Sequence, residues 1–115
     1  MPRITINGHP VDTQATRLIE AIRGQGIEIP ALCHHPALSP AGACKLCAVE
    51  VARPDKASKI GLSCCLRVRE GMEVRTDTER VYQARVKAFN DLIRYAPESR
   101  TIRDLARDFG IELAP

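Results

Sequence analysis

The feature that most constrains this chain is a set of four cysteines with the spacing C-x10-C-x2-C-x16-C, namely Cys33, Cys44, Cys47 and Cys64. The C-x2-C pair, Cys44 and Cys47, has a spacing that lets both sulfur atoms face one metal centre. Cys33 and Cys64 come from separate segments, so the folded chain must bring the four together. The set therefore predicts a buried site for a metal ion or an iron–sulfur cluster.

Three interpretations of this cysteine set compete. A structural zinc ion is one, but zinc ribbons usually present two C-x2-C pairs, and this chain has one pair and two single cysteines. Buried thiols or disulfides are the second, and a total of five cysteines suits four ligands and a spare better than paired bridges. An iron–sulfur cluster is the third and the favoured one. The plant-type spacing C-x4-C-x2-C is absent, because ten residues separate Cys33 from Cys44.

Composition limits the class of protein that carries this site. The chain has 115 residues, a usual size for one domain, and 44% of them are apolar. Its 17 basic and 14 acidic residues are interleaved, which argues against nucleic acid as a partner. No apolar run is long enough to span a membrane, and the N-terminal MPRITING lacks the apolar segment of a signal peptide. We therefore expect a cytoplasmic protein with no membrane span, whose cysteines stay reduced.

The hydrophobic pattern predicts strands first and helices afterwards. Strands are expected at 3–6, 9–13, 47–51, 60–68 and 72–75. The dipeptide Asn7-Gly8 predicts a type I′ hairpin turn between the first two. The segment 33–42 has no periodicity and predicts a long functional loop, and 53–59 predicts a polar turn.

Three helices are expected. Thr13 or Thr16 would cap the first, which ends at the glycines that follow Arg23. Thr78 would cap a long helix with Tyr82, Val86, Phe89 and Ile93 on its packed face, and Ser99 or Thr101 a short last one. The order predicts an α+β fold. It divides the chain into a domain over residues 1–77 and a helical extension over 78–115, packed on that domain or on a partner.

The run CHHPALSPAGACKLCAVEV, followed by SC and EGMEVRT, closely resembles the N-terminal [2Fe–2S] domain of the large iron–sulfur subunit of respiratory complex I. NAD-linked hydrogenases and formate dehydrogenases carry the same domain. The resemblance extends from Ile4 to the helix after Thr78. It implies a β-grasp ferredoxin fold and one [2Fe–2S] cluster, with four ligands: Cys33, Cys44, Cys47 and Cys64.

Two adjacent cysteines offer a choice for the last ligand. In the family that the chain resembles this ligand follows a serine, as Cys64 follows Ser63. In a strand, neighbouring residues point to opposite faces, so only one of the pair would face the cluster. We therefore predict Cys64 as the ligand and Cys65 as a small core residue. His34 and His35 are expected to pack and hydrogen-bond around the cluster.

The chain also departs from the complex I pattern. In those relatives a segment rich in histidine and cysteine follows the domain and binds a [4Fe–4S] cluster. The corresponding stretch here, RYAPESRTIRDLARDFGIEL, contains neither residue, so no second cluster is expected in it. We accordingly expect a small subunit or a separately encoded carrier.

The expected function is one-electron transfer through the [2Fe–2S] cluster. No constellation of acid, base or nucleophile is visible, so no catalytic residue is predicted. The setting that the resemblance implies is a multi-subunit NAD(P)H-, formate- or hydrogen-linked oxidoreductase, whose partner subunits carry flavin, iron–sulfur or molybdopterin cofactors. A zinc-stabilised protein-interaction module and an iron–sulfur redox sensor are the alternatives.

Overall fold

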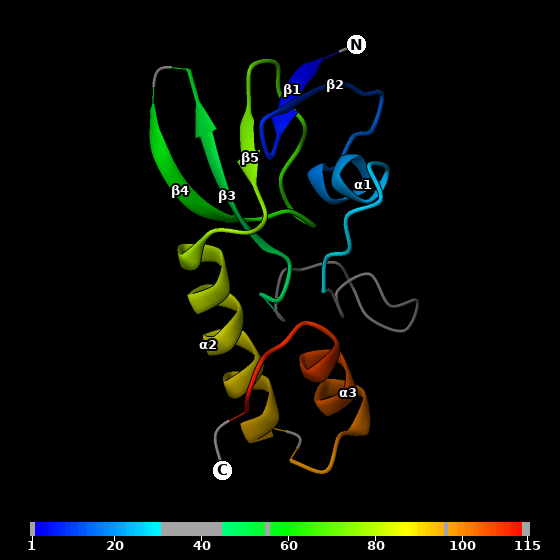
Figure 1. The fold of residues 1–115 in the computed structure, drawn as a ribbon, viewed down its shortest axis with the longest axis vertical. Coiled ribbons are helices and arrows are strands. Elements are labelled where there is room, and N and C mark those ends of the chain that lie inside the picture. The colour runs from blue at the N-terminus through cyan, green and yellow to red at the C-terminus, as the bar shows by residue number, and fades with distance from the viewer. Residues whose placement is uncertain (1, 31–44, 55, 96, 114–115) are drawn as a thin grey trace.

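The computed structural model describes residues 2–30, 45–54, 56–95 and 97–113, with Tyr95 described by its backbone alone. Within these ranges the elements follow the order β1-β2-α1-β3-β4-β5-α2-α3. Figure 1 shows the sheet at one end of the elongated molecule and the last two helices at the other. No helix in the described part of the chain has the length and apolar character needed to cross a membrane.

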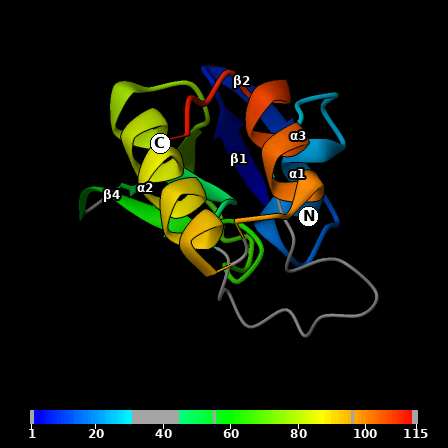
Figure 2. The ribbon, with the colours of Figure 1, turned by 90° about the horizontal axis from the view of Figure 1, so that it is seen from below.

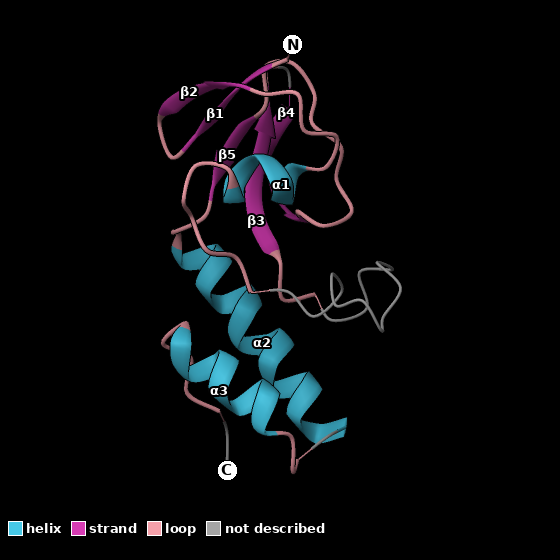
Figure 3. Cartoon of the chain, turned by 90° about the vertical axis from the view of Figure 1, so that its right-hand side faces the viewer, coloured by secondary structure: helices cyan, strands magenta, loops and turns pink. Residues whose placement is uncertain are grey.

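The described strands form one mixed sheet in the order β2-β1-β5-β3-β4. The strands are β1 (Arg3–Ile6), β2 (His9–Asp12), β3 (Ala48–Arg53), β4 (Lys56–Leu62) and β5 (Glu73–Arg75). Among these described strands, only β1 and β5 pair in parallel. Helix α1 (Leu18–Arg23) lies against one face (Figure 3). A mixed sheet of this order crossed by one helix is the β-grasp arrangement, so the predicted α+β fold is confirmed.

The main core lies between the sheet and α1. Alternate residues of the central strands point to this side, which the period-2 pattern predicts. Val74 of β5 pairs with Ile6 on one side and with Val51 on the other, and all three are buried. From α1, Leu18 and Ile22 close the core with no exposed surface.

The hairpin turn between β1 and β2 is confirmed. Asn7 and Gly8 have φ values of 51° and 86°, the left-handed backbone that a type I′ turn requires. The Asn7 side chain also reaches the end of β5. Its Nδ2 donates to Thr76 Oγ1 at 2.9 Å, and its Oδ1 accepts from the Thr76 amide at 2.9 Å. One asparagine therefore supplies the turn conformation and ties the hairpin to a neighbouring strand.

We expect Asn7→Ala to lower the free energy of unfolding by about 1–3 kcal/mol, because it removes two hydrogen bonds and places alanine at a positive φ. Urea unfolding followed by circular dichroism measures the loss. The control is Asn7→Asp, which keeps the acceptor for the Thr76 amide and tolerates the left-handed backbone, and should lose less. An equal loss in both variants would contradict this account.

Two local predictions were wrong. Helix α1 begins after Arg17 without a side-chain cap, and Thr13 instead accepts a hydrogen bond from the amide of Ala15. The expected polar turn at 53–59 is the β3–β4 hairpin, with β4 already starting at Lys56. The first four residues of β4 are exposed along a sheet edge, so no apolar alternation marks them as a strand.

The predicted strand at 60–68 ends at Leu62. Residues 63–65 instead form a turn, because the Leu62 carbonyl accepts hydrogen bonds from the amides of both Cys65 and Leu66. The backbone therefore reverses at the point where the chain carries its two adjacent cysteines. This difference matters for the candidate site.

The two C-terminal helices are α2 (Glu79–Tyr95) and α3 (Arg100–Asp108). The predicted caps are confirmed: Thr78 accepts a hydrogen bond from the amide of Val81, and Ser99 from the amide of Ile102. Helix α2 contacts β3 and β4, and α3 packs on α2 (Figure 2). Tyr82, expected on the packed face of α2, is 41% exposed.

Candidate metal centre

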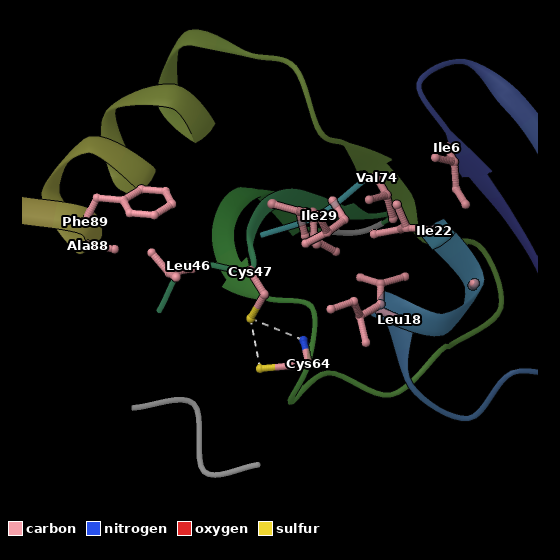
Figure 4. Packing of buried hydrophobic residues seen from close by; sticks show 14 of the residues in the cluster. Ile6, Leu18, Ile22, Ile29, Leu46, Cys47, Cys64, Val74, Ala88 and Phe89 are labelled. Atoms are coloured by element: carbon pink, nitrogen blue, oxygen red, sulfur yellow. Dashed lines mark hydrogen bonds between the residues drawn. The ribbon is translucent and has the colours of Figure 1, made fainter. Parts of the chain in front are cut away.

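Two of the four predicted ligands lie in the described part of the chain, and the fold brings them together. Cys47 directly precedes β3, and Cys64 lies in the turn after β4. Both have no exposed surface, and their Sγ atoms are 2.8 Å apart (Figure 4). Cys33 and Cys44 lie outside the described residues, as do His34 and His35.

The register of the β3–β4 hairpin produces this meeting. Ala48 pairs with Leu62 at the end of the antiparallel ladder, so the residues just beyond that pair face each other. Ser63 continues the contact, because its amide and its Oγ both donate to the Cys47 carbonyl, at 3.1 and 2.7 Å. Ser63 is fully buried, and hydrogen bonds are stronger where water is excluded. The hairpin therefore fixes the spacing of the two sulfurs.

A backbone donor also points at one of the sulfurs. The amide of Cys64 lies 3.4 Å from Cys47 Sγ and donates to it (Figure 4). Hydrogen bonds of this kind stabilise negative charge on a ligand sulfur and influence the reduction potential of a cluster. The turn thus supplies a candidate ligand and a hydrogen-bond donor from one residue.

Helix α1 holds this turn from the other side. The Ile19 amide donates to the Ser63 carbonyl at 3.0 Å, and Arg17 Nη1 donates to the Cys64 carbonyl at 3.0 Å. The beginning of the helix and the turn are also joined by a hydrogen bond from the Leu18 amide to the Leu66 carbonyl. The position of the Cys64 sulfur therefore depends on packing across the whole β-grasp core.

The prediction that Cys65 is a core residue was wrong. Its side chain is exposed, and its Sγ lies 3.8 Å from that of Cys64. The expectation assumed a strand, in which the sheet would cover one face and the cluster the other. In the observed turn, the Cys65 side chain points away from the interior and faces solvent. The turn still directs only one of the two thiols inward, and that one is Cys64.

The segment before Cys47 connects the site to α2. Lys45 has a left-handed backbone with φ of 56°, which turns the chain so that Leu46 points inward. Leu46 is fully buried and points toward Phe89 and Ala88 of α2 (Figure 4). Helix α2 thereby covers one side of the candidate site.

Arg85 of α2 is a residue that the sequence reasoning missed. Its Nε and Nη2 atoms are buried and have no hydrogen-bond partner among the described residues. Burial lowers the pKa of Arg85, and the charge of Cys47 acts in the opposite direction. The guanidinium carbon also lies 5.9 Å from the centre of the Phe109 ring, a distance typical of a cation–π contact. The one sequence signal for a buried Arg85 is its position on the apolar face of the helix.

The donor set fits an iron–sulfur cluster. Cysteine sulfurs are the usual ligands of [2Fe–2S] clusters, and here two of them approach closely inside an apolar shell. The backbone amide that donates to Cys47 Sγ is the kind of hydrogen-bond donor that the ligand sulfurs of such clusters accept. The shell excludes water, which a buried cluster also requires. The described residues therefore present two candidate cysteine ligands.

Comparison with known families decides which group this site serves. The family described as "2Fe-2S iron-sulfur cluster binding domain" matches residues 2–79. This chain belongs to that family. The cofactor of this 2Fe-2S domain is therefore a [2Fe–2S] cluster, as predicted.

The 2Fe-2S domain is also similar to parts of larger proteins. It is 39% identical over 83 residues to the mitochondrial NADH-ubiquinone oxidoreductase 78 kDa subunit of Candida albicans, covering 71% of this chain and 11% of that protein. It is 36% identical over 86 residues to the NADH-ubiquinone oxidoreductase 75 kDa subunit of Reclinomonas americana, covering 74% of this chain and 12% of that protein. The chain therefore spans only about a tenth of the length of these curated relatives.

A solved structure supports the fold over nearly the whole chain. The crystal structure of an NAD+-reducing [NiFe]-hydrogenase in the H2-reduced state contains a chain that matches with a TM-score of 0.74. The match covers 97% of this chain and 50% of that one, at 24% sequence identity. At this identity the similarity establishes the fold, and it includes the C-terminal helices along with the sheet.

Proposed function

We propose that this chain transfers single electrons through a [2Fe–2S] cluster bound by four cysteines: Cys33, Cys44, Cys47 and Cys64. The observation that carries the proposal is the buried pair Cys47 and Cys64, whose sulfurs meet beside a backbone amide that donates to one of them. A [2Fe–2S] cluster supplies a centre that accepts and releases one electron without bond making in a substrate. The residues of this chain hold that centre and keep water from it.

The surroundings of the pair suit electron transfer. Cys64 is buried, yet the next residue in the turn, Cys65, is exposed. The ligand pair therefore lies one residue from the protein surface, which leaves a short path to a partner's cofactor. Ser63 and Arg17 hold the turn by hydrogen bonds, so the ligands need little rearrangement when the charge changes.

We further propose that the chain works within a multi-subunit NAD(P)H-, formate- or hydrogen-linked oxidoreductase in the cytoplasm. The similarity to large subunits of NADH-ubiquinone oxidoreductase supports this setting. Partner subunits with flavin, iron–sulfur or molybdopterin cofactors would supply and remove the electron. Within the chain, we assign residues 1–77 to the cluster domain and 78–115 to a helical extension, supported by the contact of α2 with β3.

The test is to purify the chain anaerobically and to record its visible absorption and its EPR spectrum before and after reduction. We expect a red-brown protein with two iron and two sulfide per chain, as the 2Fe-2S family implies, and an EPR signal only after reduction. A colourless protein that contains zinc would overturn the proposal and support the interaction module. Anaerobic pull-down from native cells identifies the partner subunits, and recovery without any redox subunit would contradict the proposed setting.

A further inference from the structure

We propose that Arg85 holds a partly buried positive charge on the Cys47 side of the cluster and raises the reduction potential of the cluster. The proposal rests on the proposed function in one respect, that the centre at Cys47 is a [2Fe–2S] cluster. It concerns a residue of α2, outside the segment that carries the cysteines, and assigns to α2 an electrostatic role in addition to packing.

The first step is the position of Arg85 on its helix. Residues three or four apart share one face of a helix, so Arg85 lies on the same side as Val81 and as Ala88 and Phe89. These three neighbours are buried. Phe89 and Ala88 meet Leu46, the residue next to Cys47 (Figure 4). The arginine therefore belongs to the face that α2 turns toward the site.

The second step is the free-energy cost of burying the Arg85 N–H groups at this position. A guanidinium N–H group that is buried without a partner is disfavoured, because it loses its hydration without compensation. Nε and Nη2 of Arg85 are in this situation within the described part of the chain. The ring of Phe109, 5.9 Å from the guanidinium carbon, offsets part of the cost from the α3 side. A negative charge nearby would offset more of it.

The third step is the source of that negative charge. Cys47, a ligand in the proposed site, directly follows Leu46, which lies against this face of α2. A negative charge at Cys47 favours the charged form of Arg85 and opposes the effect of burial on the Arg85 pKa. A cluster with four thiolate ligands carries net negative charge, and an added electron increases it. A fixed positive charge stabilises the reduced state more than the oxidised state, and water and salt screen a partly buried charge less than one at the surface. Arg85 would therefore favour reduction.

Removal of the charge gives a direct test. We expect Arg85→Gln to move the midpoint potential of the holoprotein to a more negative value. Arg85→Met, a second neutral variant of similar length, should produce the same shift. The expected change in the equilibrium between reduced and oxidised forms is about tenfold, which corresponds to about 59 mV for a one-electron couple. Arg85→Lys keeps the charge and should restore most of the original potential.

A matched control separates a local effect from a general loss of charge. Arg94 lies on the same helix, and its side chain is 80% exposed. Arg94→Gln removes the same formal charge and should leave the midpoint potential unchanged at about 0.15 M salt, because water and ions screen an exposed charge. The shift in the Arg85 variants should persist in high salt.

EPR-monitored redox titration of the four variants and the wild type measures these effects. The proposal is overturned if Arg85→Gln and Arg85→Met bind a normal cluster whose potential equals that of the wild type. It is also overturned if Arg85→Lys shifts the potential as far as the neutral variants, since packing alone would then explain the result. A wild-type chain that shows no [2Fe–2S] signal would instead overturn the proposed function, and this inference with it.

Discussion

Cys64→Ser is expected to abolish the visible absorption and the EPR signal of the [2Fe–2S] cluster, whereas Cys65→Ser retains both. The two cysteines are adjacent, but their environments are opposite: Cys64 is fully buried with its sulfur 2.8 Å from that of Cys47, and Cys65 is exposed. Serine is a poor replacement for a thiolate ligand, so this buried substitution removes one of the four proposed ligands. The measurement is iron content together with both spectra after anaerobic reconstitution.

The neighbouring variant is the control for this experiment, because it makes the same chemical change one residue away. The Cys65 sulfur lies 3.8 Å from that of Cys64. The comparison therefore tests whether the cluster depends on one particular thiol of two that lie close together. A cluster that survives Cys64→Ser and disappears in Cys65→Ser would reverse the assignment. Loss of the cluster in both variants would show that the turn itself, rather than one thiol, is required.

Phe89→Ala is expected to lower the free energy of unfolding by about 3–5 kcal/mol, the usual cost of deleting a fully buried phenylalanine. Phe89 is among the largest side chains without exposed surface, and it joins α2 to Leu46 beside the candidate site. The substitution leaves a cavity between the helix and the segment that ends in Cys47. Urea unfolding of the cluster-loaded protein measures the loss, and faster bleaching of the visible absorption in air should accompany it.

Tyr82→Ala is the matched control for the phenylalanine. It removes an aromatic ring from the same helix, but that residue is 41% exposed. The expected loss is below about 1 kcal/mol, because a partly exposed side chain leaves little cavity. Equal losses in the two variants would contradict the packing that the structure assigns to α2.

The order of strands and helices could be predicted because most elements bury one face. Apolar alternation marks β1, β3 and β5, and capping residues mark the starts of α2 and α3. The start of β4 could not be predicted in this way. It lies at a sheet edge with its first four residues exposed, and lysines and serine on such a strand resemble a polar turn.

The candidate site was predictable in its chemistry and less so in its geometry. Cysteine spacing indicated a metal centre, and the serine before Cys64 indicated the inward thiol. The second reason for that choice, the alternation of side chains along a strand, was wrong, since a turn held by the Leu62 carbonyl replaces the expected strand. Arg85 was missed because an arginine in a helical sequence resembles a surface residue until its neighbours in space are known.

The pairing of β1 with β5 has a consequence for how the protein reaches its native state. It joins segments almost seventy positions apart, since Thr5 pairs with Glu73, whereas Ala48 pairs with Leu62 across a short hairpin. Contacts between distant segments form late, because closing a long loop costs more entropy than closing a short one. The β3–β4 hairpin, which joins the two candidate ligands, is therefore expected to form first and the N-terminal strands to dock afterwards. Iron would then have access to the thiols before the sheet is complete.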